Sequence, residues 1–359
     1  MKKIAYLLNW DSHWGRGILN KVASHVRIWR NVGYDVKVFM LARYDGPEEA
    51  PDRLVTDIPL VVQPCRNVAD RFIQYRILVR QVTVWDPDLV YLRYEGCYPA
   101  LISLARQLPL FLEFNTDDLQ EYRLGPAYRF WYNRLTRGFL LSNAKAFVFV
   151  SHEIANKPYF TCFNKPSIVV SNGIDLSLCT PLPAPQNSNP HLLFIGSKGQ
   201  PWHGIDKILT LARSFPTWTF DIIGINTLDM PIPPNAQLHG HLNRSQYERL
   251  FARSDIAIGT LALHRNKMQE ASPLKVREYL AYGIPTIIGY NDTDFPQPVP
   301  YILQLPNTPD NITSHIQTIQ QFVEQMKGKR VPREEIGHLD MREKECVRLK
   351  FFQKILEHN

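Results

Sequence analysis

Cysteine is scarce in this chain and lacks the spacing of a metal site or a disulfide framework. Its five cysteines are widely separated, their number is odd, and no Cys-x-x-Cys pair occurs. This usage argues against structural zinc and against a secreted, disulfide-bonded scaffold. We therefore expect a protein of the reducing cytoplasm, without a bound metal.

Long apolar runs are missing as well. No such run approaches the roughly 20 residues that a membrane-spanning helix needs. The N-terminus begins with Lys2 and Lys3 like a signal peptide, but the apolar stretch that follows is short and Asp11 interrupts it. A first β-strand fits this segment better than a leader sequence.

Blocks of basic residues of the kind that bind nucleic acid are absent, although the formal net charge is +7. Residues 1–180 hold 22 Lys and Arg against 17 Asp and Glu, so +5 of this charge lies in the first half. We expect no nucleic-acid partner.

Two predicted helices in that half mix basic and aromatic residues. One combines Arg71, Arg76 and Arg80 with Phe72, Tyr75, Ile77 and Val79, and the other combines Arg129, Arg134 and Arg137 with Phe130, Trp131 and Tyr132. Such faces can rest on anionic lipid, although a core-facing helix with a solvated opposite side gives the same pattern. Peripheral contact of the N-terminal domain with the cytoplasmic membrane face is therefore a hypothesis.

Several catalytic signatures are also lacking: a Ser–His–Asp pattern, a Walker loop and a complete dinucleotide fingerprint. The loop from Asn9 to Gly17 contains Gly15 and Gly17 but no third glycine, so NAD is not expected. Glycines let a ligand approach the backbone closely, and we assign both to contact with a sugar donor or acceptor. A plain strand-to-helix turn is the alternative.

Strands and helices alternate along the whole chain, which predicts an α/β fold with parallel strands and crossover helices. The length of 359 residues suggests two doubly wound, Rossmann-like domains that face a central cleft. We place them at 1–178 and 191–341, joined by the proline-rich linker 179–190. Strands are expected at 4–8, 35–41, 89–92, 110–114, 146–150, 167–170, 191–195, 219–223, 236–238, 256–258 and 286–289, and helices at 18–30, 67–85, 100–107, 127–141, 205–213, 244–253, 308–326 and 342–357.

Two glutamates, Glu270 and Glu278, bracket the most informative segment. Pro273 fits the first turn of a helix, and the amide groups from there to Lys275 would form an anion site at the positive end of the helix dipole. Glu278 can accept hydrogen bonds from paired hydroxyls, and Glu270 can do so on the other side. Most such glutamates are solvated, but Gly283 ends the helix before a buried strand, where α/β proteins bind ligands.

A second loop, Gly196 to Gly204, again joins a strand to a helix. Its Lys198 and His203 could meet a diphosphate, although a lone loop lysine is usually solvated. Lys275 is the stronger cation, because it lies at a helix N-terminus. An ion pair between Lys275 and Glu278 is the alternative.

Polar residues also follow the predicted strand 110–114 in the first domain. Asn115 is the candidate there, since the carboxyl ends of parallel strands face the crevice. The alternative is a helix cap and turn at Thr116 and Asp117.

Three segments together resemble the GT-B retaining glycosyltransferases of family 4, also called group 1. They are Glu270 to Glu278 with Tyr279-Leu280-Ala281-Tyr282-Gly283-Ile284-Pro285, the segment Ser171-Asn172-Gly173-Ile174-Asp175, and Gly196 to Gly204 leading into Ile205-Asp206. The resemblance covers most of the chain and is clearer in the second half.

This resemblance implies that a UDP- or GDP-sugar binds mainly to the second domain, with no metal or other cofactor. Glu278 would hold the ribose hydroxyls, and Glu270 with the amides near Ser272 and Leu274 would hold the sugar. Lys275 and Lys198 would neutralise the diphosphate. The C-terminal helix 342–357 would pack back on the first domain.

The chain departs from the family at two places. The usual Arg and Lys of the second loop are replaced by Ser197 and His203, which gives Lys275 more weight. The usual His after the fourth strand of the first domain has no counterpart, because Asn115 to Asp118 stand there.

The implied reaction is sugar transfer with retention to a glycan or a lipid-linked acceptor, in polysaccharide or glycoconjugate synthesis. The catalytic candidates are Glu270, Lys275 and Asn115. A GT-B sugar-nucleotide epimerase and a nucleotide-sugar-binding protein without turnover are the alternatives. A peripheral polyanion binder would instead show salt-sensitive binding to lipid or nucleic acid.

Overall fold

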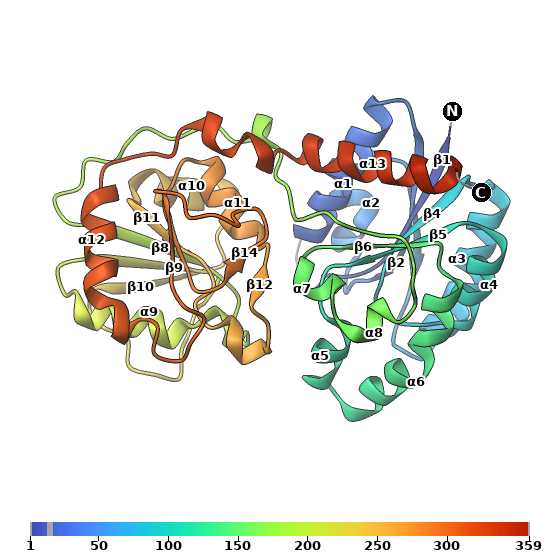
Figure 1. The fold of residues 1–359 in the computed structure, drawn as a ribbon, viewed down its shortest axis with the longest axis horizontal. Coiled ribbons are helices and arrows are strands. Elements are labelled where there is room, and N and C mark those ends of the chain that lie inside the picture. Colours follow the sequence, from blue (N-terminus) through green and yellow to red (C-terminus); the bar gives the residue numbers. More distant parts are fainter. Residues whose placement is uncertain (1, 13–16, 358–359) are drawn as a thin grey trace. The chain divides into compact units, whose positions relative to one another are not determined.

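The computed structural model describes residues 2–12 and 17–357, and the chain divides into two compact units (Figure 1). Unit 1 comprises Met1–Val170 and Met341–Asn359, and unit 2 comprises Ser171–Asp340. Each unit is built on a parallel sheet flanked by helices, which confirms the predicted α/β class with two Rossmann-like domains.

The described strands of unit 1 form one sheet in the order β3-β2-β1-β4-β5-β6-β7, with parallel pairing between neighbours. The order reverses between β1 and β4, so the loops after these two strands diverge at a topological switch point. The strands are β1 (Lys3–Asp11), β2 (Asp35–Arg43), β3 (Leu60–Pro64), β4 (Leu89–Arg93), β5 (Leu110–Phe114), β6 (Ala146–Phe149) and β7 (Ser167–Val169).

Helices cover both faces of this sheet. On one face, Tyr6 of β1 stacks on Trp29 of α1 and Phe352 of α13 packs against the same indole. On the other face, Phe39 of β2 contacts Trp85 of α3. The helices of unit 1 are α1 (Gly17–Asn31), α2 (Pro51–Leu54), α3 (Asp70–Trp85), α4 (Pro99–Gln107), α5 (Asp118–Arg123), α6 (Ala127–Asn143), α7 (His152–Ala155), α8 (Pro158–Thr161) and α13 (Met341–Glu357).

The C-terminal helix α13 joins unit 1 through buried charged groups. Arg348 donates from Nε to Glu345 Oε2 at 2.9 Å, and its Nη1 lies 3.6 Å from Glu113 Oε1. The Trp29 indole nitrogen donates to the same Glu345 oxygen at 2.7 Å. Because these charges are almost fully shielded from solvent, each depends on the others for compensation.

Unit 2 repeats the architecture of unit 1. Its main sheet has the order β10-β9-β8-β11-β13-β15 with parallel pairing, and β12 and β14 form a separate parallel pair. The strands are β8 (His191–Ile195), β9 (Thr219–Ile223), β10 (Ala236–Gly240), β11 (Ile256–Ile258), β12 (Glu270–Ala271), β13 (Thr286–Ile288), β14 (Asn291–Asp292) and β15 (Ile302–Gln304). The helices are α9 (Ile205–Ser214), α10 (Arg244–Arg253), α11 (Leu274–Ala281) and α12 (Ile316–Met326).

The proline-rich segment 179–190, expected as a linker, is fastened to unit 2. Leu182 N donates to Tyr282 O at 3.1 Å, and Asn187 Nδ2 donates to Asp255 Oδ2 at 2.8 Å. Prolines lack an N–H group, but their carbonyl oxygens still accept hydrogen bonds, as Pro183 O does from Arg330 Nε. The division between the units therefore falls at 170/171, before the segment Ser171 to Asp175.

Two edge strands and one helix are among the elements that differ from the sequence prediction. The edge strand β3 was not predicted, because Pro59 precedes it and Pro64 is its last residue; proline is tolerated at a sheet edge. The edge strand β15 is also new. The helix expected over 308–326 begins only at Ile316, after a 3₁₀ turn at Thr313–His315.

Candidate functional site

The candidate site of unit 2 lies where the loops after β8 and β11 meet. These strands are adjacent at the point where the sheet order reverses, so their carboxyl ends form the switch point of the sheet. The two loops bond to each other, with Leu261 N donating to His203 O at 3.3 Å and Ala262 N donating to Trp202 O at 3.1 Å. The sequence motifs of this half thus converge on one edge of the sheet.

The loop after β8 folds tightly, and this explains two of its glycines. A Cβ atom at Gly196 would lie 2.8 Å from His203 Nδ1, closer than carbon and nitrogen can approach. Gly204 has a φ of +74°, a left-handed conformation that glycine adopts without strain, and it caps α9. Glycine at these positions lets His203 turn back under the loop.

Helix α11 has clear start and stop signals. Pro273 is its N-cap residue, and Gly283, with a φ of +82°, ends it. Gly283 N donates to Leu280 O and Ile284 N to Tyr279 O, as in a glycine-terminated helix. The Tyr279 hydroxyl accepts a hydrogen bond from Ile195 N at 2.7 Å, which ties α11 to the end of β8.

Lys275 lies in the first turn of α11 and contacts the loop after β8. Its Nζ is 3.0 Å from His203 Nε2 and 4.5 Å from the centre of the Phe194 ring. Burial lowers the pKa of Lys275 to about 7. Burial, and then the nearby Lys275 charge, lower the pKa of His203 to about 3. His203 is therefore a neutral acceptor that orients Lys275, and it adds no positive charge at neutral pH.

Glu278 lies one turn after Lys275 on the same helix. Its Oε1 accepts a hydrogen bond from the Tyr247 hydroxyl of α10 at 2.9 Å. Its Oε2 has no hydrogen-bond partner among the described residues. Burial raises the pKa of Glu278, and the Tyr247 hydrogen bond opposes that rise. The ion pair with Lys275, which was the alternative interpretation of this segment, does not form, since Lys275 contacts His203 instead.

Ser272 is buried and held by its neighbours. Its hydroxyl oxygen accepts hydrogen bonds from Asn172 N at 2.9 Å and from Arg277 Nη2 at 2.8 Å. Its carbonyl oxygen accepts from Asn172 Nδ2 at 2.6 Å. The Ser272 hydroxyl and carbonyl thus help to fix the loop, and its backbone amide is the group that the sequence prediction assigned to the sugar.

Arg277 is the residue that fixes this loop, and it was not predicted from the sequence. The guanidinium is fully buried and forms a bidentate pair with Asp292, with Nη1–Oδ2 and Nη2–Oδ1 distances of 2.6 and 2.7 Å. It also bonds Asp294 at 2.6 Å. Asp292 belongs to β14 and lies 15 residues after Arg277. The pairing of β14 with β12 brings it to the loop, and this pairing cannot be read from the local sequence.

Three other residues that were predicted for the site belong to unit 2. Glu270 starts β12 and is half-buried. Leu274 is the first residue of α11 and is exposed, and by helix geometry its amide lacks an intrahelical acceptor. Lys198 is exposed on the loop after β8 and reaches Thr227 Oγ1 at 3.3 Å. Lys207, which was not predicted for the site, donates hydrogen bonds to Leu261 O and Asn311 Oδ1 and so joins α9 to the loop after β11.

The predicted residues of unit 1 lie at the carboxyl ends of its strands. Asn115 follows β5, and its Oδ1 accepts a hydrogen bond from Lys21 Nζ at 2.8 Å. Gly17 is the first residue of α1, and a Cβ there would meet nothing within 4 Å. Gly15 falls outside the described residues.

Glu95 is a residue that the sequence argument missed. It follows β4 at the switch point of unit 1, and its side chain is 18% exposed. Burial raises its pKa to about 8, although Arg93 and Arg71 oppose the shift. Its Oε1 lies 3.7 Å from Arg93 Nε. Only the strand order identifies this position, because a glutamate after a short strand is unremarkable in sequence.

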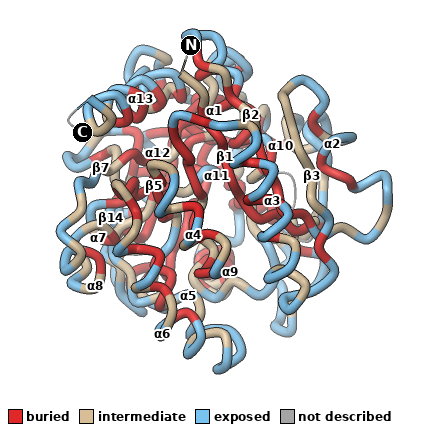
Figure 2. Tube along the Cα trace, turned by 90° about the vertical axis from the view of Figure 1, so that its right-hand side faces the viewer, coloured by how far each residue is buried: buried red, intermediate tan, exposed pale blue. Residues whose placement is uncertain are grey.

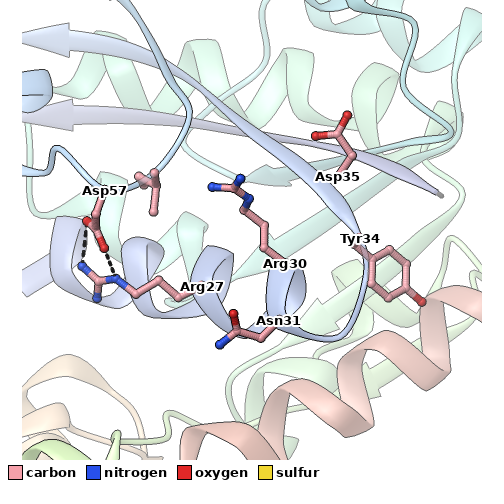
Figure 3. Close-up of a pocket in the computed structure, with 7 residues that line it drawn as sticks. Arg27, Arg30, Asn31, Tyr34, Asp35 and Asp57 are labelled. Carbon is pink, nitrogen blue, oxygen red and sulfur yellow. Dashed lines mark hydrogen bonds and ion pairs between the residues drawn. The ribbon is translucent and has the colours of Figure 1, made fainter.

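A surface cavity of about 510 Å³ lies at the opposite end of unit 1 (Figure 3). Arg27, Arg30 and Asn31 of α1 line it together with Asp35, the first residue of β2, and Asp57. Arg27 forms a bidentate pair with Asp57 across its wall. Since the cavity lies at the amino end of β2, it is remote from the edge where parallel sheets bind ligands.

Within residues 2–12 and 17–357, no group of three or more His, Cys, Asp or Glu side chains is placed to hold a metal ion.

Comparison with known proteins gives a family for part of the chain. The sequence profile of Glycosyltransferase Family 4 matches residues 17–178. No curated protein matches the sequence. The profile covers the half in which the sequence motifs were weaker.

Solved structures resemble the whole chain. Sucrose-phosphate synthase from Thermosynechococcus elongatus superposes with a TM-score of 0.66 at 14% identity, over 100% of this chain and 97% of the other. HepE from Anabaena, in complex with UDP-glucose, gives 0.62 at 14%, over 100% and 99%. UDP-GlcNAc 2-epimerase from Neisseria meningitidis gives 0.56 at 13%, over 98% and 100%. At such identities the likeness establishes the fold.

Proposed function

We propose that this chain is a GT-B glycosyltransferase of the family 4 type, which transfers a sugar from a nucleoside diphosphate sugar to an acceptor with retention; the family profile over residues 17–178 and the fold shared with solved glycosyltransferases support this. The donor is a UDP- or GDP-sugar, and the acceptor is a glycan or a lipid-linked glycan. The protein would serve polysaccharide or glycoconjugate synthesis.

One observation carries the proposal: Lys275 and Glu278 lie one helical turn apart beside the switch point of unit 2. A cation at a helix N-terminus suits the diphosphate, because the helix dipole and the free N–H groups add to its attraction. A carboxylate one turn further, with Oε2 open among the described residues, suits the ribose hydroxyls. The order of Lys275 and Glu278 along α11 thus matches the order of diphosphate and ribose in a nucleotide sugar.

In the proposed reaction, the bond between the sugar C1 and the diphosphate oxygen breaks while the acceptor oxygen bonds to C1 on the same face. The acceptor proton passes to a diphosphate oxygen. Lys275 and the amides of the first turn of α11 stabilise the charge that develops on this leaving group. Glu270 is assigned to the sugar hydroxyls.

In unit 1, we assign the polar residues Glu95 and Asn115 to contact with the acceptor. Because burial raises the pKa of Glu95 to about 8, its carboxyl group is largely protonated at neutral pH and can donate a hydrogen bond to an acceptor oxygen. Asn115 offers an amide beside Lys21.

The choice of a nucleotide sugar is supported by HepE, which has the same fold and was solved with UDP-glucose. The test is to incubate the full chain with UDP-, GDP-, ADP- and TDP-sugars and to follow thermal stabilisation and nucleotide release. Retention is checked by the anomeric configuration of the product. If no donor stabilises the protein, the transferase proposal fails.

Two variants rank the cations. Lys275→Ala should weaken donor binding more than Lys198→Ala, because Lys198 is exposed and carries only a long hydrogen bond to Thr227. Equal or reversed effects would refute the assignment of Lys275.

An epimerase is the second candidate, favoured by the structural likeness to UDP-GlcNAc 2-epimerase. Such an enzyme needs no acceptor, so a change in the configuration of the sugar in a nucleotide sugar incubated alone would support it. Donor binding without either turnover would instead indicate a nucleotide-sugar-binding protein.

A further inference from the structure

Helix α6 of unit 1 exposes a row of large apolar side chains, although it also buries Leu140 and Leu141 in the core. Its exposed side carries Tyr128, Trp131, Leu135 and Phe139, which we call the α6 stripe. The spacing of three, four and four residues keeps them on one side of the helix. Trp131 is 58% exposed and Leu135 is 70% exposed.

The buried side of α6 is partly polar. Arg137 forms a bidentate pair with Asp118, at 2.8 and 2.9 Å. Asn133 donates to Asp118 at 2.7 Å and accepts from the Tyr94 hydroxyl at 2.7 Å. These hydrogen bonds help to anchor the helix, while the side chains of the α6 stripe face outward and lose the hydrophobic stabilisation that burial would give.

The apolar surface continues from α6 onto α3 and α4. The rings of Phe72 and Tyr132 meet edge to face at 5.8 Å, which links α3 to α6. A cavity of about 560 Å³ between α3 and α4 is lined by Phe72, Ile73, Arg76 and Pro99, among others. Figure 1 shows the three helices on the same side of the sheet of unit 1, and Figure 2 marks exposed residues along α3 and α6 in pale blue.

The charge of these helices is almost entirely positive. In the fully described helices α3, α4 and α6, the seven arginines face a single acidic residue, Asp70. Four of the arginines are exposed at the surface, namely Arg76, Arg80, Arg106 and Arg134. Not all residues predicted for this face lie on it, because Tyr75 and Val79 are buried and Arg137 is used in the core.

From these contacts we infer that the surface formed by α3, α4 and α6 docks on an anionic lipid bilayer, with the α6 stripe inserted at the level of the headgroups. Tryptophan and tyrosine favour that depth, and surrounding arginines attract anionic headgroups. A symmetric contact with a second copy would place this positive surface against itself, which costs energy. In the described part of the chain no helix has the length and apolar character to cross a bilayer, so the contact is peripheral.

The inference rests on exposed side chains of unit 1 and does not depend on the proposed transferase activity. Its test is flotation of the full chain with phosphatidylcholine vesicles, with and without phosphatidylglycerol. We expect binding only to the vesicles with phosphatidylglycerol, and weaker binding as salt increases, because lipid headgroup charges are screened. Equal binding to neutral vesicles, or no binding to anionic ones, would overturn it.

Variants then locate the surface. Trp131→Ser with Leu135→Ser should lower vesicle binding by at least about tenfold, since each side chain leaves an apolar environment. The matched control is Val32→Ser with Val347→Ser, which removes two residues that are 60% and 47% exposed outside α3, α4 and α6. The control should bind vesicles like the wild type, and equal losses would refute the assignment.

Two further measurements keep the result specific. Stabilisation by a nucleotide sugar should be the same in Trp131→Ser/Leu135→Ser as in the wild type, so a failed transferase proposal and a failed membrane proposal remain distinguishable. A concentration-dependent dimer that this double variant abolishes, without vesicle binding by the wild type, would assign the surface to a second copy and overturn the inference.

Discussion

The pKa of Lys275 makes donor binding depend on pH in a way that can be calculated. In the free protein, burial lowers the pKa of Lys275 to about 7, so roughly half of the molecules carry a neutral amine at pH 7. A bound diphosphate would place negative charge beside the ammonium group and restore a pKa near its ordinary value of about 10.4. Binding must then be accompanied by proton uptake.

The direction and size follow from this shift. Donor binding favours the charged form, so the full affinity is present below pH 7 and is lost as the pH rises toward the pKa of the bound state. Between pH 6 and pH 9 the fraction of free protein with a charged Lys275 falls about a hundredfold. The affinity for the donor falls by the same factor, which corresponds to about 2.7 kcal/mol. His203 stays neutral over this range, because its pKa is about 3.

Isothermal titration calorimetry of the active donor measures both quantities. Titrations at pH 6, 7, 8 and 9 give the affinity profile, and buffers of different ionisation enthalpy give the proton uptake, about half a proton at pH 7 if the pKa is near 7. Lys275→Ala should bind weakly and equally at every pH. Lys275→Arg should remove the dependence, because arginine stays charged.

The control must separate Lys275 from another buried lysine. Burial lowers the pKa of Lys207 to about 8, so it titrates in the same range, but its Nζ is bonded to Leu261 O and Asn311 Oδ1. If Lys275→Ala keeps the pH dependence of the wild type, the titrating group lies elsewhere. If the wild type takes up no protons, the assignment of Lys275 to the diphosphate is refuted.

Three other changes test the site and its support. Glu278→Gln should weaken donor binding by about ten- to a hundredfold, since a charge-assisted hydrogen bond contributes about 1.5–3 kcal/mol, and an unchanged affinity in calorimetry would remove Glu278 from the site. Glu95→Gln should raise the free energy of unfolding by up to about 4–5 kcal/mol at pH 8 and by less than about 1 kcal/mol at pH 4.5, because the folded state resists an ionisation that the unfolded chain undergoes above its ordinary pKa. Urea denaturation that shows the same difference at both pH values would contradict this. Arg277→Met should lower the free energy of unfolding, measured by urea denaturation, by about 3–5 kcal/mol, because Asp292 and Asp294 are left buried without their cation. It should also abolish stabilisation by the donor. A loss below about 1 kcal/mol in urea denaturation would show that the network is dispensable.

Local patterns in the sequence were sufficient for most of the fold. The strands predicted at 110–114, 191–195, 219–223 and 256–258 have the observed bounds, because each is a short apolar run between polar turns. Strand β3 was missed because proline residues in and before it are typical of loops. The helix predicted at 308–326 was too long because its first residues form turns, including the 3₁₀ turn at Thr313–His315. The order of strands in each sheet is a non-local property that no such run reveals.

The local placement of the candidate residues could be predicted where it depends on one segment, and their contacts could not be predicted where they join two segments. The placement of Lys275 and Glu278 on one helix follows from Pro273 and Gly283 alone. The contact of Lys275 with His203 spans 72 residues, and it changes the role of the histidine from cation to acceptor. Glu95 required the strand order, because only the switch point distinguishes it from other glutamates after strands.

The short helix α11 explains why one segment carries so much of the signal. Its sheet-facing side holds Val276, Tyr279 and Leu280 in the core, while Arg277 is fixed by the aspartates beyond β13. Lys275 and Glu278 occupy the remaining side. Since every side has a partner, rotation of the helix by one residue would bury a charge and expose a core side chain at once. The arrangement of the proposed phosphate and ribose contacts therefore depends on the packing of α11, and substitutions that move the helix should lower donor affinity even where they do not touch these contacts.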